Sequence, residues 1–221
     1  MGRLPILVAV ALVALATTTG ALAGRGDPRR AITSADQALA KAMLLRKSDL
    51  AAGFTASPQG KDPNFYCAAL DESDLTLTAD AESPDFTLQA PGRIFSIASA
   101  AQIYRSSNQA LASWRRSTSD AGERCAAREL SSVIAGSGGT FRSLKRIAFP
   151  KVAPLTVSYR VAAELTSGQQ KVPAYIDVVV LQRGRAQVAF FVFSVGAPLV
   201  RSEMLAFARL TAARMKSAMS R

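Results

Sequence analysis

The last third of the chain has the clearest pattern of hydrophobic and polar positions. From Leu155 to Leu165, apolar residues occupy every second position, which is the period of a β-strand with one buried face. The runs Tyr175–Leu181 and Val188–Val195 are apolar at nearly every position, as expected for strands covered on both faces. The polar sequence Gln182-Arg183-Gly184-Arg185 separates them and contains the glycine that favours a tight turn. These positions predict a strand followed by a β-hairpin.

A membrane helix is the alternative for residues 175–195, because this segment is long and apolar enough to cross a bilayer. A helix would place Asp177, Arg183 and Arg185 in lipid, at about 2.5–3.5 kcal/mol for each charge near the bilayer centre. Each valine or phenylalanine returns only about 0.3–0.6 kcal/mol on the same scale. The hairpin is therefore predicted. Its two arginines, Arg183 and Arg185, are candidate partner contacts, and a solvated turn is the alternative role.

Helical spacing appears on both sides of this region. Residues 35–47 predict a first helix, residues 93–104 a strand, and a further helix begins at Ser106. Another helix runs from Asp120 to the glycine cluster at 136–139. The lone tryptophan, Trp114, is expected in the core at this spacing, with a ligand-stacking platform as the alternative.

The C-terminal residues form an apolar stripe from Met204 to Met219 with basic residues outside it. Such a helix can lie on an anionic membrane, but packing on the adjacent strands is predicted because those strands need a cover. The order of elements predicts one α+β domain: a largely antiparallel β-sheet with helices on both faces.

The stretch 71–85 gathers six of the sixteen acidic residues. A calcium loop needs Asp or Asn at alternate positions, a glycine at the turn and a closing Glu, and that register is missing. We expect a solvated strand-and-loop edge, in which Leu75 and Leu77 alternate with threonines.

The N-terminus has the layout of a secretory signal peptide, with a basic residue, an apolar run and Ala21-Leu22-Ala23 before the cleavage site. Residues 1–23 are predicted to be removed, 24–33 to form a flexible basic leader, and 34–221 to form the single domain. An uncleaved anchor is the alternative. After cleavage no membrane span is expected, so the protein is predicted to be secreted or held in the cell envelope.

Charge and cysteine content refine this picture. The net charge of +11 would suggest nucleic acid in a cytoplasmic protein, but an exported one meets anionic lipids and wall polymers instead. Export also favours a disulfide between the only two cysteines, Cys67 and Cys125, with two buried free thiols as the alternative. A metal site is disfavoured because two cysteines without histidine fall short of four ligands.

The chain has no histidine, which excludes Ser-His-Asp, Cys-His and histidine-ligated zinc chemistry. The patterns of a Ser-Lys hydrolase and of a nucleophile elbow are also missing. A hydrolase that uses paired carboxylates remains an alternative. We predict no enzymatic activity, no catalytic residue, no cofactor and no metal.

The sequence resembles a known group of proteins in the pieces NFYCAALDESDLTLTADAESPDF, IYRSSNQALASWRRSTSDAGERCAAREL, AYIDVVVLQRGRAQVAFF and AFARLTAARM. These are similar in layout to the extracellular sensor domain of actinobacterial membrane Ser/Thr kinases and to envelope lipoproteins with a PsbP-like α/β/α sandwich. The resemblance implies a binding or sensing module without catalytic residues, in which Cys67 and Cys125 match positions that pair. A lipidation cysteine and a kinase domain, which those proteins carry, are not found here.

The predicted function is therefore that of an exported, non-catalytic binding or sensor-like domain. A sheet between helices readily forms an apolar cleft, and the charge favours a lipid-like ligand or an anionic envelope polymer. A passive envelope interaction protein is the alternative.

Overall fold

The computed structural model of the chain describes residues 26–59, 66–90, 93–168 and 170–220. The predicted signal peptide lies outside these residues. The helices are α1 (Ser34–Met43), α2 (Ser107–Ser117), α3 (Asp120–Gly136) and α4 (Arg201–Met219), with short 3₁₀ turns η3 (Lys47–Asp49) and η4 (Ala68–Leu70). The strands are β1 (Arg29–Arg30), β2 (Thr55–Ser57), β3 (Thr76–Glu82), β4 (Asp85–Ala90), β5 (Arg93–Tyr104), β6 (Thr140–Arg146), β7 (Leu155–Ser167), β8 (Gln170–Arg183) and β9 (Ala186–Val195).

The nine strands of the described residues form one sheet in the order β1-β3-β5-β9-β8-β7-β6, and β4 pairs with both β5 and β2. β1 is parallel to β3, and the other pairs are antiparallel. The predicted hairpin is confirmed as β8 and β9, in which Arg183 pairs with Ala186 around a two-residue turn. Gly184 in that turn has φ +58°, a backbone conformation that costs glycine little.

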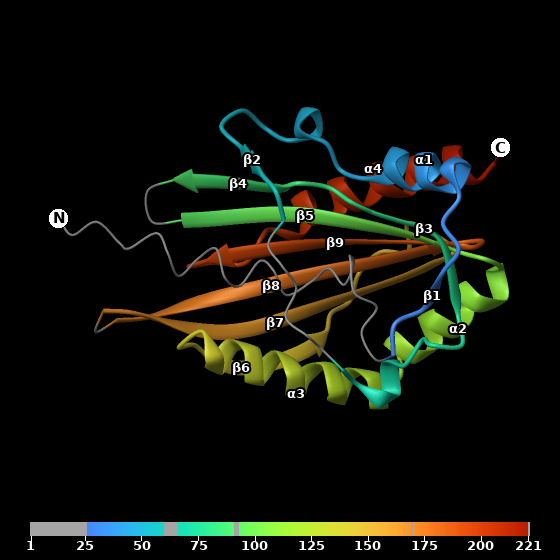
Figure 1. Ribbon diagram of the computed structural model, residues 1–221. Helices are drawn as coiled ribbons and strands as arrows, with labels where there is room; N and C mark the ends of the chain where they lie inside the picture. The colour runs from blue at the N-terminus through green and yellow to red at the C-terminus, as the bar shows by residue number, and fades with distance from the viewer. Residues whose placement is uncertain (1–25, 60–65, 91–92, 169, 221) are drawn as a thin grey trace.

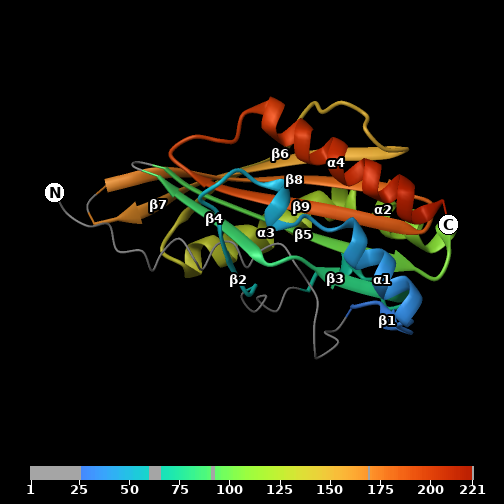
Figure 2. The same ribbon diagram turned by 90° about the horizontal axis from the view of Figure 1, so that it is seen from above.

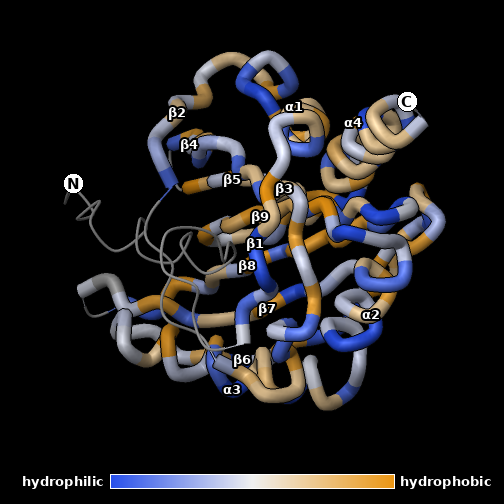
Figure 3. Tube along the Cα trace, turned by 45° about the vertical axis from the view of Figure 1, so that its right-hand side comes forward, coloured by the Kyte–Doolittle hydropathy of each residue, from blue (hydrophilic) through white to orange (hydrophobic). Residues whose placement is uncertain are grey.

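Helices cover both faces of the sheet, so the predicted α+β architecture is confirmed (Figure 1). α1 and α4 lie together on one face, here called the α4 face, and α2 and α3 lie on the other, here called the α3 face (Figures 1 and 2). Alternation along each strand sends successive side chains to the two layers: in β9, Val192 joins the cluster of the α4 face and Phe193 that of the α3 face. Hydrophobic positions therefore gather along the sheet between the helical layers (Figure 3).

The two faces are buried to different extents. Among the described residues, the apolar cluster on the α4 face has 25 buried members, whereas the clusters against α3 and α2 have 7 and 4. The predicted packing of the C-terminal helix is confirmed, because α4 buries Met204, Ala208, Ala212 and Met215 in the larger cluster. No helix of the described residues combines the length and the apolar character needed to cross a membrane.

The acidic stretch 71–85 begins with the expected solvated loop, in which Ser73 and Asp74 are exposed, but its strand is not the predicted edge. β3 lies between β1 and β5, and Thr76 to Ala81 are buried. The carboxylate of Asp80 has no exposed surface and pairs with Arg30 at 3.1 Å. The edge position is taken by β1, which belongs to the segment predicted as a flexible leader.

That prediction is wrong for residues 29–33. The backbone N–H groups of Arg29, Ala31 and Thr33 donate to the carbonyl oxygens of Leu75, Leu77 and Thr78. The composition is that of a tail, but an open edge of β3 provides the carbonyl partners that a polar segment needs to become a strand.

Two further differences concern α1 and β6. α1 ends at Met43, four residues before the predicted end at 47, and it buries Asp36, Ala40 and Met43. β6 has no run of alternating apolar residues, because it is an edge strand with basic side chains and a bulge in its pairing with β7.

Candidate functional site

An apolar cavity of about 220 Å³ opens on the α4 face. Seven of its eight lining residues are apolar, and the eighth is Glu203. The lining comprises Ala51, Phe54, Leu88, Ala90, Phe95, Leu199, Glu203 and Phe207. We call this site the alkyl cavity.

Four segments of the chain build the alkyl cavity. Leu88 of β4 pairs in register with Phe95 of β5, which places both side chains on the same face of the sheet as a floor. Leu199, Glu203 and Phe207 follow one another at intervals of four residues, so they lie on one side of the chain where α4 begins. The segment before β2 supplies the third wall.

Aromatic contacts fix the two ends of this cavity. The rings of Phe54 and Phe95 meet edge to face with centroids 5.8 Å apart, and Phe207 meets Phe190 in the same manner at 6.4 Å. Such pairs are stabilising beyond their buried area, so the walls are pre-formed rather than collapsed. With apolar walls and one exposed carboxylate, the cavity suits a hydrocarbon chain whose head group carries no negative charge.

A second cavity, of about 190 Å³, lies where β6 ends against β7 and α2. Its lining is more polar than that of the alkyl cavity and includes aromatic, hydroxyl and guanidinium groups. The lining comprises Trp114, Thr118, Arg146, Ile147, Phe149, Thr156, Val157 and Ser158. We call this site the Trp114 cavity.

Arg146 is fixed in the Trp114 cavity by its neighbours. Its Nε donates to Glu123 Oε1 at 3.1 Å, and its Nη2 donates to the same carboxylate and to the carbonyl oxygen of Thr118 at 2.7 Å. The hydroxyl of Tyr159 also donates to Glu123 Oε1, at 3.0 Å, and the guanidinium lies over the Tyr159 ring, 5.7 Å from its centroid. Burial, followed by the bond to Glu123, raises the pKa of Tyr159 to about 12, so this hydroxyl stays a donor at neutral pH.

Trp114 is not a core residue as expected. It is partly exposed, lies in the last turn of α2 and lines the second cavity. The alternative of a ligand-stacking platform therefore remains open for this residue.

The hairpin-tip arginines have different surroundings from those predicted. Arg185 is turned inward: its Nη1 and Nη2 bond the two carboxylate oxygens of Asp36, and Nη1 also lies 3.2 Å from Thr78 Oγ1. This guanidinium links the hairpin to α1 and keeps 31% of its side-chain surface exposed, so its role as a partner contact stays a prediction. Arg183 is partly buried, and its Nε has no hydrogen-bond partner among the described residues.

The link between Arg185 and Asp36 changes the acidity of the carboxyl group. The hydrogen bonds from Arg185 lower the pKa of Asp36 below its ordinary value of 3.8, against the opposing effect of burial. A second link of this kind joins Arg214 of α4 to Asp49, with both N–O distances at 2.7 Å. Arg214 is one of the basic residues outside the apolar stripe of the C-terminal helix, but this link leaves its side chain only 20% exposed.

The two cysteines are joined on the α3 face. Cys67 and Cys125 form a disulfide with their Cα atoms 6.1 Å apart, which connects the residue before η4 to α3. The bond predicted from export is therefore present in the structure.

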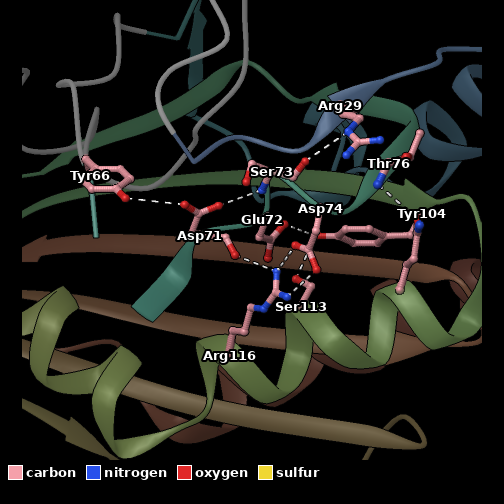
Figure 4. A network of polar contacts seen from close by, with 11 residues as sticks. Arg29, Tyr66, Asp71, Glu72, Ser73, Asp74, Thr76, Tyr104, Ser113 and Arg116 are labelled. Atoms are coloured by element: carbon pink, nitrogen blue, oxygen red, sulfur yellow. Dashed lines mark hydrogen bonds and ion pairs between the residues drawn. The ribbon is translucent and has the colours of Figure 1, made fainter. Parts of the chain in front are cut away.

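A polar network joins the 71–76 segment to β5 and α2 (Figure 4). The hydroxyl of Tyr104 donates to Glu72 Oε2 at 2.9 Å, and Ser113 Oγ lies 2.8 Å from the same hydroxyl oxygen. Arg116 holds Asp74 with two hydrogen bonds of 2.6 and 2.7 Å and also bonds the carbonyl oxygen of Asp71. Burial raises the pKa of Glu72 and, more strongly, that of Tyr104. The network attaches the 71–76 segment to α2.

A buried ion pair lies beneath the α4 layer. Asp177 of β8 has no exposed side-chain surface, and Arg160 of β7 bonds its two oxygens at 2.6 and 3.1 Å. Burial raises the pKa of Asp177 although Arg160 acts in the opposite direction. These residues face each other in register, so the pair ties β7 to β8 rather than lining either cavity.

Sequence reasoning did not identify the residues that line the two cavities. The alkyl cavity is built from four separate segments, and nothing in the local pattern of Phe95 or Phe207 distinguishes a cavity wall from a core position. Trp114 offered a signal, since a single tryptophan beside basic residues is a candidate platform, but its helical spacing favoured burial.

No protein-family model matches the sequence, and no curated protein matches it. Among solved structures, the extracellular domain of PknH from Mycobacterium tuberculosis is similar at 11% sequence identity and a TM-score of 0.48, with 84% of this chain and 97% of that chain covered. LpqN, involved in cell envelope biogenesis of Mycobacterium tuberculosis, is similar at 10% identity and a TM-score of 0.30, with 73% and 86% covered. One neighbour is an extracellular domain and the other a protein of cell envelope biogenesis, which agrees with the layout that the sequence resembles. At these identities and TM-scores the neighbours identify no ligand and no site in this chain.

Proposed function

We propose that the protein is an extracytoplasmic, non-catalytic binding domain that holds the hydrocarbon chain of a lipid-like molecule in the alkyl cavity. The observation that carries this proposal is a cavity in which every lining residue except Glu203 is apolar. Its volume of about 220 Å³ is below the roughly 300–1,000 Å³ of sites for drug-sized ligands, so one alkyl chain fits better than a ring system.

The location outside the cytoplasm has separate support. The Cys67–Cys125 disulfide is of the kind that persists in oxidising compartments, and the first 23 residues have the layout of a signal peptide. A domain in that setting is exposed to envelope lipids.

The head group of the ligand is constrained by charge. Glu203 is exposed at the cavity and is the only charged residue among the described residues that line it. A carboxylate or phosphate monoester beside Glu203 would be repelled, so a zwitterionic or neutral head group is favoured. The anionic partner expected from the net charge of the chain does not fit this cavity.

Calorimetric titration with monomeric dodecylphosphocholine tests the proposal. We expect saturable binding, and across alkyl chains of increasing length the affinity should rise about fourfold per methylene until the cavity is filled, since each buried CH₂ contributes about 0.8 kcal/mol. The variant Ala51→Phe should weaken binding at least about tenfold, because Ala51 lines the cavity and a phenyl ring placed there occupies part of it.

Ala52→Phe is the matched control, since Ala52 is also exposed but is outside the lining. Equal affinities for the two variants would place the alkyl chain elsewhere. No saturable binding to the unmodified protein at any chain length would favour the alternative of an interaction protein without a small ligand.

A further inference from the structure

The Trp114 cavity contains polar groups with which an alkyl chain cannot form hydrogen bonds. Two aromatic side chains, Trp114 and Phe149, contribute to its walls together with the hydroxyl-bearing residues Thr118 and Thr156. The face of an indole ring is electron-rich and attracts the partly positive C–H groups of a ring placed against it. The surrounding hydroxyl, carbonyl and guanidinium groups are those that bond ligand hydroxyls.

Arg146 gives this cavity its positive group. It is the only charged side chain among the eight described lining residues, and Glu123, which lies beside the cavity, offsets part of its charge. Three hydrogen bonds, to Glu123 twice and to Thr118 once, engage the Nε and Nη2 hydrogens of Arg146. Since a guanidinium has five N–H donors, the two on Nη1 remain for a ligand, and half of the side chain (49%) is exposed.

The position of Arg146 is also pre-organised. Glu123 and the carbonyl oxygen of Thr118 hold its guanidinium in one orientation, and the Tyr159 ring lies beneath it. A ligand therefore meets a cation whose conformational freedom has already been reduced, which lowers the entropic cost of binding.

We infer that the Trp114 cavity is a subsite for one acidic sugar ring of an anionic glycan, with the ring face against Trp114 and its carboxylate on Arg146. The volume of about 190 Å³ suits a single ring. The site is separate from the alkyl cavity in residues and in chemistry. This inference does not depend on the proposed function, and its test is separate.

The lone tryptophan provides the readout, because its fluorescence reports only on this cavity. Titration with sodium glucuronate should change Trp114 emission saturably, and D-glucose, which lacks the carboxylate, should bind at least about tenfold more weakly. Arg146→Gln should weaken glucuronate binding by the same factor. Arg142→Gln, which removes an exposed arginine of the same strand that pairs with Glu164 outside the cavity, should leave it unchanged.

Because Arg146 also ties β6 to Glu123, circular dichroism must show that Arg146→Gln is folded. If it is not, the comparison of glucuronate with glucose on the unmodified protein decides alone. No saturable response to glucuronate, equal affinities for the two sugars, or full affinity in a folded Arg146→Gln protein would overturn the inference. Binding of dodecylphosphocholine in the same samples shows separately whether the alkyl cavity is functional.

Discussion

The two faces of the sheet are held to their helices by different means. The α4 face has the large apolar cluster, with the Arg185–Asp36 and Arg214–Asp49 links at its margin. The α3 face has two small clusters, and there a disulfide and the network around Tyr104 make the connection. The apolar cavity lies under α4, and the polar one lies beside α2 at the end of β6.

This difference suggests how a small apolar cluster is supplemented. Burial contributes roughly in proportion to apolar area, so the α3 face gains less from it than the α4 face. On the α3 face, a covalent bond and directional hydrogen bonds supply the rest of the stabilisation. They also leave polar groups near the surface, where the Trp114 cavity is formed.

The largest expected effect is the loss of the disulfide. A double variant, Cys67→Ala with Cys125→Ala, should lower the free energy of unfolding by about 4 kcal/mol, because the bond spans 58 residues and restricts the unfolded chain. Chemical denaturation of the oxidised protein and of the variant measures the difference. In the folded variant, dodecylphosphocholine affinity should be retained. Parallel loss of alkyl binding would show that the two faces are not independent.

Next in size is the buried ion pair of the α4 face. Arg160→Met should cost about 2–3 kcal/mol at neutral pH, since Asp177 would be left charged and buried without a partner. Without Arg160, which lowers the pKa of Asp177, that pKa rises further above its ordinary value of 3.8. When the pKa of a carboxyl group is raised in the folded protein, ionising that group destabilises the fold. The free energy of unfolding therefore falls as the pH rises through that pKa. The deficit relative to the unmodified protein should therefore shrink as the pH falls toward 4.

Denaturation of both proteins at several pH values between 4 and 8 measures this trend. The exposed pair of Arg142 and Glu164 is a suitable control. Arg142→Met also removes an arginine from an ion pair, but that pair lies on the neighbouring strand and is exposed to solvent. A pH-independent deficit in Arg160→Met would mean that Asp177 is not the group responsible.

The smallest expected effect concerns the link between the hairpin tip and α1. Arg185→Met should lower stability by about 1–2 kcal/mol at pH 7, where Asp36 is ionised and its depressed pKa stabilises the folded state. That stabilisation is present above the ordinary aspartate value of 3.8 and is lost as the pH falls through the depressed pKa. The difference between variant and unmodified protein should therefore vanish in acid, and a constant difference would contradict the assignment to Asp36.

The elements with strong periodicity were predicted from the sequence, and those formed by pairing with a distant strand were not. β5, β8, β9 and α4 follow from their own residues, because each buries a face whose period is visible locally. β1 and β6 depend on an edge that another strand offers, so their polar residues give no local signal.

The roles of the charged residues were the hardest to predict. Arg185 and Asp36 are 149 residues apart in the chain, and nothing near either of them indicates the other. A turn arginine is solvated by default, and only the fold brings a buried carboxylate within its reach. The two cavities share this dependence, since their walls come from segments that are adjacent only in the folded protein.

The attachment of α1 has a consequence for the order of assembly. This helix is made early, yet the two arginines that fasten its neighbourhood, Arg185 and Arg214, arrive 149 and 165 residues after their carboxylate partners. In a chain delivered N-terminus first, from a ribosome or through a translocation channel, α1 and η3 therefore cannot form these two ion pairs until nearly all of the chain has emerged. Contacts of such long sequence separation slow folding. Premature closure of the N-terminal part alone is thus disfavoured during synthesis and transport.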